Sequence, residues 1–108
     1  MMGYQVTFYS QQGRRIGHKP VQDWLMALCR SLGIEGATTV AGTEGIGRGG
    51  KVHSAHFFEL ADQPLEITMA LTEAQCTSLF ALLQQQNADL FYVKTAVEFG
   101  VVGAPRQA

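Results

Sequence analysis

The run GATTVAGTEGIGRGG, residues 36–50, leads from a β-branched segment directly into glycine. It holds six of the chain's twelve glycines, three threonines and one arginine. β-Branched residues favour strands, so ATTVA (37–41) is predicted to be extended. Glycine lets the backbone reach positive φ and approach a ligand closely, so residues 42–52 are predicted to form a loop. Glycine content alone leaves two alternatives open, a loop that orders around a ligand and a hairpin loop that binds nothing.

Two amphipathic helices are predicted, one on each side of this stretch. Before it, apolar residues recur at helical spacing, with Pro20 in the first turn and Gly33 where a left-handed C-terminal cap is expected. After it, TEAQ (72–75) is a capping-box sequence that opens a second helix to about Gln86. The two apolar stripes consist of Val21, Trp24, Leu25, Leu28, Cys29 and Leu32, and of Cys76, Leu79, Phe80 and Leu83. Both cysteines are therefore expected to be buried hydrophobic side chains rather than redox groups.

Alternating polar and apolar residues predict the other strands. YQVTFY (4–9) and LFYVKTAVEF (90–99) each have the period of one strand, and Phe91 is expected in the core. VHSAHFFEL (52–60) is predicted to be extended, and residues 65–71 to be the second half of the same strand after a bend or bulge at ADQP. The order βαββαβ predicts an α+β ferredoxin-like sandwich, an antiparallel sheet with two helices on one face.

In this topology three connections share one end of the molecule, because the first helical crossover joins parallel strands. They are residues 10–19, 42–52 and 86–90. Five of the eight basic residues lie in the first two of them, namely Arg14, Arg15, Lys19, Arg48 and Lys51. The sequence therefore predicts an anion-binding site at this end.

The other face of the sheet is predicted to be a subunit contact. Its expected residues are neither plainly core nor plainly surface: Gln5, Thr7, Tyr9, Glu66, Thr68, Tyr92, Lys94 and Ala96. Such a mixed face suits a homo-oligomer better than a dry interior.

Length and charge limit the classes of protein. With 108 residues, 46% of them hydrophobic, the chain is expected to form a single domain over residues 1–108, with a loose tail at 104–108. The net charge of −1 gives no electrostatic reason for a nucleic-acid partner. No stretch reaches the roughly 18–20 apolar residues of a membrane span. A cytoplasmic protein without membrane insertion is the expectation.

The run LGIEGATTVAGTEGIGRGGKVHSA (32–55) resembles the second strand and following loop of the PII-like signalling proteins, and is most similar to a branch of unknown function. The positions that carry the resemblance are Gly36, Thr38, Gly45, Gly47 and His53. The resemblance implies a trimer of ferredoxin-like subunits, with adenine nucleotides in the clefts between subunits. It also implies that residues 42–53 are a flexible loop, similar to the T-loop of that family, which engages a target.

The resemblance also implies the binding residues. Thr38 would lie near the adenine, and the phosphates would meet the loop. The nucleotide-binding set expected on this basis is Thr38, Gly42, Thr43, Gly45, Gly47, Arg48 and Lys51, with Arg14, Arg15 and His53 as additional candidates. Gly49 stands where PII proteins proper carry glutamine, so 2-oxoglutarate sensing is not expected. QQNADL (85–90) lacks their glycine-lysine phosphate loop, and VEFGVVG (97–103) lacks their arginine pair. AMP, ADP or cyclic AMP is therefore expected rather than ATP.

The predicted function is nucleotide-dependent regulation of a partner, such as a membrane transporter or an enzyme, by a homotrimer that is not itself an enzyme. No cofactor is obligatory, and bicarbonate or another small co-effector is a further possible ligand. The alternative is a structural or divalent-metal-binding trimer of the same fold. It would use His18, His53 or His56, but no metal site is predicted, because residues three apart on a strand point to opposite faces.

Overall fold

The computed structural model describes residues 1–46, 52–54 and 63–103, the middle segment by its backbone only. The helices are α1 (Val21–Ser31) and α2 (Glu73–Gln85). The strands are β1 (Met2–Gln11), β2 (Arg15–Ile16), β3 (Lys19–Pro20), β4 (Gly36–Ala41), β5 (Glu44–Ile46), β6 (Val52–Ser54), β7 (Pro64–Thr72) and β8 (Phe91–Glu98). None of the helices in the described part of the chain is long and apolar enough to cross a membrane.

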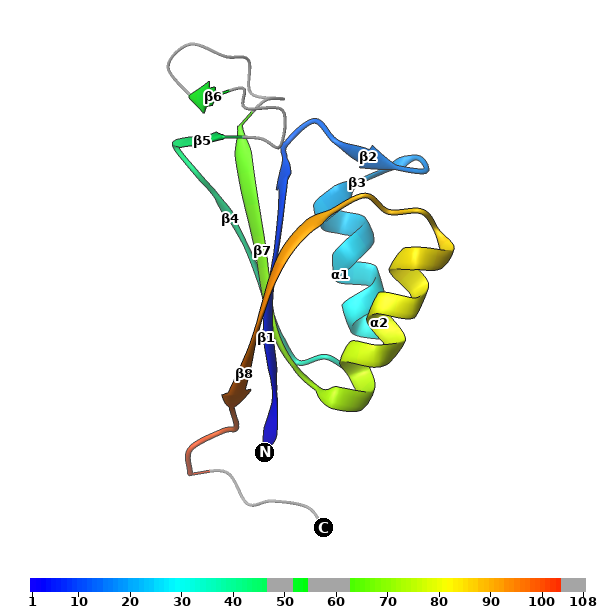
Figure 1. Cartoon of the computed structure of the whole chain (residues 1–108), viewed down its shortest axis with the longest axis vertical. Helices are drawn as coiled ribbons and strands as arrows, with labels where there is room; N and C mark the ends of the chain where they lie inside the picture. The colour runs from blue at the N-terminus through cyan, green and yellow to red at the C-terminus, as the bar shows by residue number, and fades with distance from the viewer. Residues whose placement is uncertain (47–51, 55–62, 104–108) are drawn as a thin grey trace.

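A four-stranded sheet of order β4-β7-β1-β8 forms the centre of the fold, and all neighbouring strands are antiparallel. Both helices cover one face of it, as Figure 1 shows. Strands β1 and β4 run in the same direction, because each is antiparallel to β7. The predicted α+β ferredoxin-like sandwich is thus confirmed.

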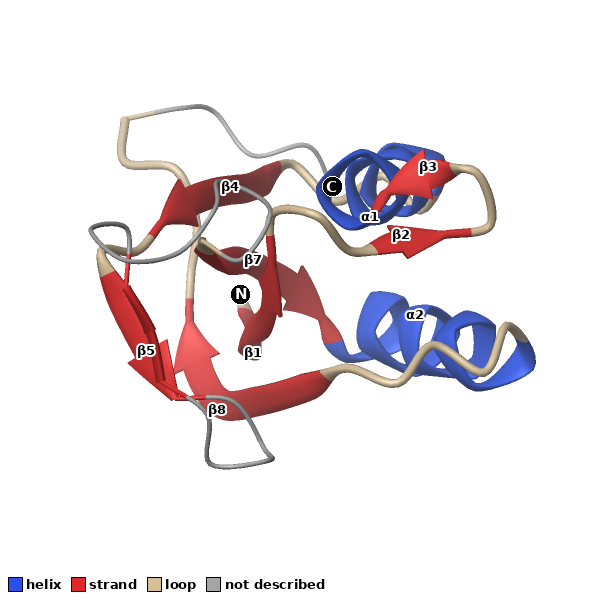
Figure 2. Ribbon diagram, turned by 90° about the horizontal axis from the view of Figure 1, so that it is seen from above, coloured by secondary structure: helices blue, strands red, loops and turns tan. Residues whose placement is uncertain are grey.

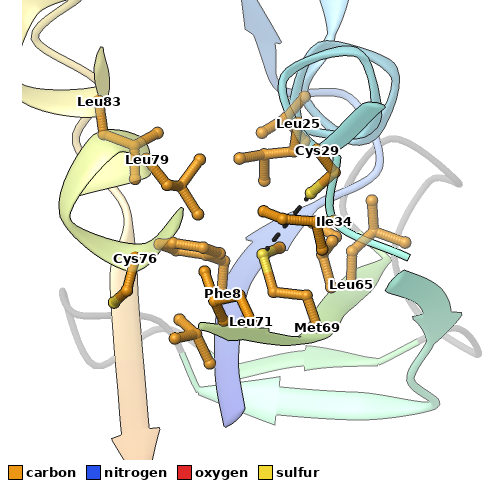
Figure 3. Close-up of a cluster of buried hydrophobic side chains, with 13 residues drawn as sticks. Phe8, Leu25, Cys29, Ile34, Leu65, Met69, Leu71, Cys76, Leu79 and Leu83 are labelled. Atoms are coloured by element: carbon orange, nitrogen blue, oxygen red, sulfur yellow. Dashed lines mark hydrogen bonds between the residues drawn. The ribbon is translucent and has the colours of Figure 1, made fainter. Parts of the chain in front are cut away.

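The core lies between the helices and the sheet. Helix α1 buries Val21, Leu25 and Cys29, and α2 buries Cys76, Leu79 and Leu83, as the stripes predict. They meet alternate residues of the central strands, namely Val6, Phe8, Leu65, Ile67, Met69 and Leu71, together with Ile34 (Figure 3). The Cys29 Sγ lies 3.6 Å from the Met69 Sδ in this cluster. Burying a side chain of this size contributes about 1.5–3 kcal/mol, so the cluster dominates stability.

The helix ends follow the local sequence. Pro20 is the N-cap of α1 rather than part of its first turn, and Gly33 adopts a φ of 73° just after the helix. At α2 the capping box is complete: the Gln75 N–H donates to the Thr72 hydroxyl, and the Thr72 N–H donates to the Gln75 side-chain oxygen.

Strand β6 differs from its predicted role. It pairs with β5 in a separate two-stranded sheet, with His53 opposite Gly45. It is therefore not the first half of β7, which lies in the main sheet. The glycine-rich stretch folds back on itself, so pairing within the loop competes with continuation into the sheet. Residues 55–62 of the predicted extended segment lie outside the described residues.

The sequence prediction also placed the side chains of β8 on the wrong faces of the sheet. Tyr92, Lys94 and Ala96 pair with Phe8, Val6 and Tyr4, and so lie on the helix-covered face. The Tyr92 ring is 4.8 Å from that of Phe80, and the Lys94 ammonium is 4.4 Å from the centre of the Tyr4 ring. The residues of β8 on the face away from the helices, here called the open face, are Phe91, Val93, Thr95 and Val97. Phe91 is 47% exposed and not part of the core.

Candidate functional site: a cleft at the loop end of the sheet

An open cleft of about 710 Å³ lies at one end of the main sheet. The sheet contributes its floor and the β4–β5 segment one wall, while Arg14 and Asp89 come from the other two connections at this end. Figure 2 looks onto this end of the molecule and shows β5 set apart from both helices. The lining residues are Tyr9, Ser10, Gln11, Arg14, Gly42, Glu44, Gly45, Ile46, Pro64, Leu65, Glu66, Asp89, Phe91 and Val93. The three loops predicted to share an end do meet around one cavity.

Gly42 and Gly45 form the wall of the cleft beside Pro64. The Gly42 N–H donates to the Pro64 carbonyl at 2.8 Å. A Cβ on Gly45 would lie 3.1 Å from the Pro64 Cγ, so this glycine allows close packing. Among the described glycines, positive φ occurs only at Gly17, Gly33 and Gly103. Gly42 and Gly45 therefore do not adopt positive φ, and close approach to Pro64 accounts for glycine at Gly45.

Arg14 ties the first and third connections together. Its guanidinium donates a hydrogen bond to the backbone carbonyl of Asp89, in the segment between α2 and β8. Arg15, its neighbour, instead donates to the carbonyl of His18 within the β2–β3 hairpin and does not line the cleft. Of the two arginines predicted here, the structure brings only Arg14 to the cleft.

The floor of the cleft is partly aromatic. Tyr9 and Phe91 are cross-strand neighbours on the open face, with ring centres 5.7 Å apart and planes inclined by 51°. Tyr9 is 40% exposed and Phe91 is 47% exposed, and Val93 follows on the same face. The sequence prediction missed Phe91 and Val93 because it assigned β8 to the wrong face.

The described lining is richer in acidic than in basic residues. It contains Arg14 but also Glu44, Glu66 and Asp89. The predicted basic end is therefore only partly realised, since Arg15 and Lys19 lie in the β2–β3 hairpin away from the cleft lining. Arg48 and Lys51 lie outside the described residues.

The remaining predicted residues are placed as follows. Thr38 lies on the open face opposite Thr68, in the row next to that of Glu66 and Tyr9, and is not among the lining residues. Thr43 lies between β4 and β5 and is also absent from the lining. Gly47 lies outside the described residues, and His53 is described only by its backbone in β6.

The described residues offer no metal cluster. No group of three or more His, Cys, Asp or Glu side chains among residues 1–46 and 63–103 is arranged to hold a metal ion. His56 lies outside the described residues, and His18 lies in the β2–β3 turn, beyond the cleft lining.

Solved structures with the same fold include known PII-like proteins. The chain resembles CPII, a nitrogen regulatory PII-like protein from Thiomonas intermedia K12, in its structure bound to ADP, AMP and bicarbonate. The TM-score is 0.64 at 18% identity, over 90% of this chain and 89% of that one. A candidate PII-like signalling protein from Thermus thermophilus gives a TM-score of 0.65 at 14% identity, over 90% and 88%. The apo form of CPII gives 0.53 at 19% identity, over 90% and 92%. The chain therefore has the fold of the PII-like superfamily.

Sequence comparison assigns the family. No curated protein sequence matches the chain significantly. Residues 3–99 match the model of DUF190, described as "Uncharacterized ACR, COG1993". This match runs from the second residue of β1 to the residue after β8, so it includes both helices and the whole main sheet. The chain belongs to the DUF190 family.

Proposed function

We propose that the protein is a PII-like regulatory protein, not an enzyme, that binds an adenine nucleotide in the cleft at the loop end of the sheet. The observation that carries this proposal is the cleft itself, where an aromatic floor lies beside the backbone of Gly42 and Gly45 and the guanidinium of Arg14. A base and a phosphate need these two kinds of surface side by side. The likeness in fold to CPII, whose structure holds ADP, AMP and bicarbonate, supports the same proposal.

The charge of the cleft favours AMP, ADP or cyclic AMP over ATP. Arg14 is the one basic residue in the described lining, against Glu44, Glu66 and Asp89. Each added phosphate charge would be repelled by the carboxylates of Glu44 and Glu66. In this proposal the residues of the 42–53 loop, including Gly47, Arg48 and Lys51, complete the phosphate site when a ligand is bound. Bicarbonate is the proposed co-effector, because it is a small anion of single charge.

Regulation follows from the proposed assembly. The open face joins three copies in a homotrimer, and a neighbouring subunit closes the cleft near Thr38. Ligand contacts made in one state of the 42–53 loop shift its population toward that state. That state then controls a cytoplasmic partner such as a transporter or an enzyme.

Native mass spectrometry tests the proposal directly. Spectra are recorded for the purified protein alone and then with AMP, ADP, ATP and cyclic AMP in turn. The expected result is a trimer that gains up to three copies of one nucleotide, with ATP the weakest of the four. A trimer that binds none of them would leave the fold intact and refute the nucleotide role.

Arg14 and Arg15 provide a matched pair of variants. Arg14→Ala is expected to weaken nucleotide binding by about 1.5–3 kcal/mol, the usual value of a charge-assisted hydrogen bond to phosphate. Arg15→Ala removes the same charge from the adjacent residue, whose guanidinium bonds to His18 outside the cleft, and is expected to change affinity little. Isothermal titration calorimetry measures both. Equal losses in the two variants would remove Arg14 from the site.

A further inference from the structure

One row of side chains crosses the open face at the floor of the cleft. Strand pairing aligns Val40 with Glu66, Glu66 with Tyr9, and Tyr9 with Phe91. The last three of these residues all line the cleft. A carboxylate therefore lies directly beside an exposed aromatic pair, and cross-strand neighbours on one face are about 4.5–5.5 Å apart at their Cβ atoms.

The aromatic pair offers ring faces to a base. Both rings are nearly half exposed in the single chain, and because their planes are inclined by 51° a flat base stacks on one ring and meets the other at an angle. Val93 extends the same apolar floor toward the middle of the sheet. A base packed against Tyr9 and Phe91 has one edge toward β7, where Glu66 lies beside Tyr9.

We propose that Glu66 is a specificity-determining residue, which accepts a hydrogen bond from the exocyclic amine of a base packed against Tyr9 and Phe91. This inference rests on the proposed function and names the part of the nucleotide that the cleft selects. A carboxylate at neutral pH accepts hydrogen bonds and donates none. It attracts the amino group at C6 of adenine and repels the carbonyl oxygen that hypoxanthine and guanine carry at the same position.

The charges of the cleft give the nucleotide one orientation. Glu66 disfavours a phosphate beside it. The loop side of the cleft also carries Glu44 and Asp89, but it holds Arg14, the basic residue of the described lining, and the Gly42 and Gly45 backbone. The base is therefore placed over the sheet and the phosphate toward the loops. In this orientation the group at C6 faces the carboxylate. Adenine offers an amine there, whereas hypoxanthine and guanine offer a carbonyl oxygen and can donate only from the neighbouring N1.

AMP and IMP differ at this group and have the same ribose and phosphate, so they form the sharpest pair of probes. We expect the wild-type protein to bind AMP at least about tenfold more tightly than IMP, as a charge-assisted hydrogen bond implies. In Glu66→Gln the side chain keeps its size but can donate to a carbonyl oxygen. The AMP-to-IMP ratio is then expected to fall to within about threefold, mainly because IMP binds better. Isothermal titration calorimetry at one ionic strength gives all four dissociation constants.

The outcomes separate this inference from the proposed function. Wild-type protein that binds AMP and IMP equally, or a Glu66→Gln variant that keeps the wild-type ratio, would overturn the role of Glu66 and leave nucleotide binding in place. Tighter binding of GMP than of AMP would also overturn it. Protein that binds no nucleotide at all would overturn the proposed function together with the inference.

Two neighbouring residues of β8 test the stacking surface. Phe91→Leu is expected to weaken AMP and IMP equally, by about tenfold, because stacking on an aromatic side chain does not depend on the group at C6. Tyr92→Leu is the matched control: Tyr92 is also 47% exposed but lies on the helix-covered face and does not line the cleft. It is expected to leave both affinities unchanged. Equal losses in the two variants, with both folded and in the wild-type oligomeric state, would refute stacking on Phe91.

Discussion

Cys29 and Cys76 are the buried thiols of the two helices, at 2% and 4% exposure. Burial raises the pKa of both side chains above the ordinary thiol value. At Cys76 the nearby Lys94 ammonium opposes this by lowering the pKa, and Glu73 adds to the rise. Both thiols therefore favour the protonated form in the folded state, and both are buried, unlike the exposed thiol of a reactive cysteine.

The raised thiol pKa values predict how stability depends on pH. Above the ordinary thiol pKa of about 8.5 the unfolded chain loses protons that the folded chain still holds, so the free energy of unfolding falls as pH rises. Below that pH the contribution is fully present. Urea unfolding of the wild type and of a Cys29→Ala, Cys76→Ala double variant, measured at neutral pH and in mild alkali, checks this. The variant is expected to lose less stability between the two conditions, and an equal loss would contradict the prediction.

For single residues, the sequence predicts the core well and the lining of the cleft only in part. Val6, Phe8, Leu25 and Leu79 are buried as expected, because each lies on a clear apolar stripe. Apolar residues occupy both odd and even positions of β8, so alternation alone does not show which of its side chains face the helices. Pairing with β1 decides it, and that pairing brings Phe91 to the cleft.

Helix α2 is joined to the end of α1 by one side chain. The Gln75 amide nitrogen donates to the carbonyl oxygens of Leu32 and Gly33, at 3.2 and 3.1 Å. Its oxygen meanwhile accepts from the Thr72 N–H in the capping box. The capping box is readable from the sequence, but the link to α1 is not, because it joins residues more than forty positions apart.

This double role predicts that Gln75→Glu is destabilising, although glutamate is common at this position of a capping box. The carboxylate keeps the bond from Thr72 but loses the donor and faces two carbonyl oxygens. The expected loss is about 0.5–1.5 kcal/mol, the net value of a hydrogen bond, because one of the two bonds is exposed and water can replace part of what is lost. Thr72→Ala, which removes the other half of the box, is expected to cost about 1 kcal/mol. Chemical denaturation compares them. A glutamate variant as stable as wild type would show that the bonds to α1 contribute nothing.

The β5–β6 hairpin is a second structural feature that could not be predicted from the sequence. Six glycines in residues 36–50 predict an irregular loop, yet Glu44–Ile46 pairs with Val52–Ser54 as a short antiparallel hairpin. Gly45 is required there because Pro64, nearly twenty residues later, packs against it. Contacts of this kind depend on where the main sheet brings β7, which local composition does not encode.

For the molecule as a whole, the two faces of the sheet differ in what covers them. The helices bury one face, while no described helix covers the open face, and β5 stands opposite it at the loop end, where it forms a wall of the cleft (Figure 2). At its centre the hydroxyls of Thr7 and Thr68 are hydrogen-bonded at 2.9 Å, between the aromatic row near the cleft and a row of smaller residues. At the end of the sheet away from the cleft, the N-terminal amine donates a hydrogen bond to the carbonyl of Phe99. Because the floor of the cleft is part of the open face, the two form one continuous surface, which neighbouring copies of the proposed trimer would share.

This surface gives the last prediction, that Thr68→Lys dissociates the proposed trimer into folded monomers. A lysine at the centre of the open face would have to be buried without a partner in each interface, at a cost of several kcal/mol per charge. Thr68→Val removes the same hydroxyl without adding charge and is expected to remain trimeric, as is Ala81→Lys on the exposed side of α2. Light scattering after size exclusion gives the mass of each species, and circular dichroism verifies its fold. A trimeric Thr68→Lys variant would show that the copies meet elsewhere, and the cleft would then have to bind its ligand without a neighbouring subunit across the open face.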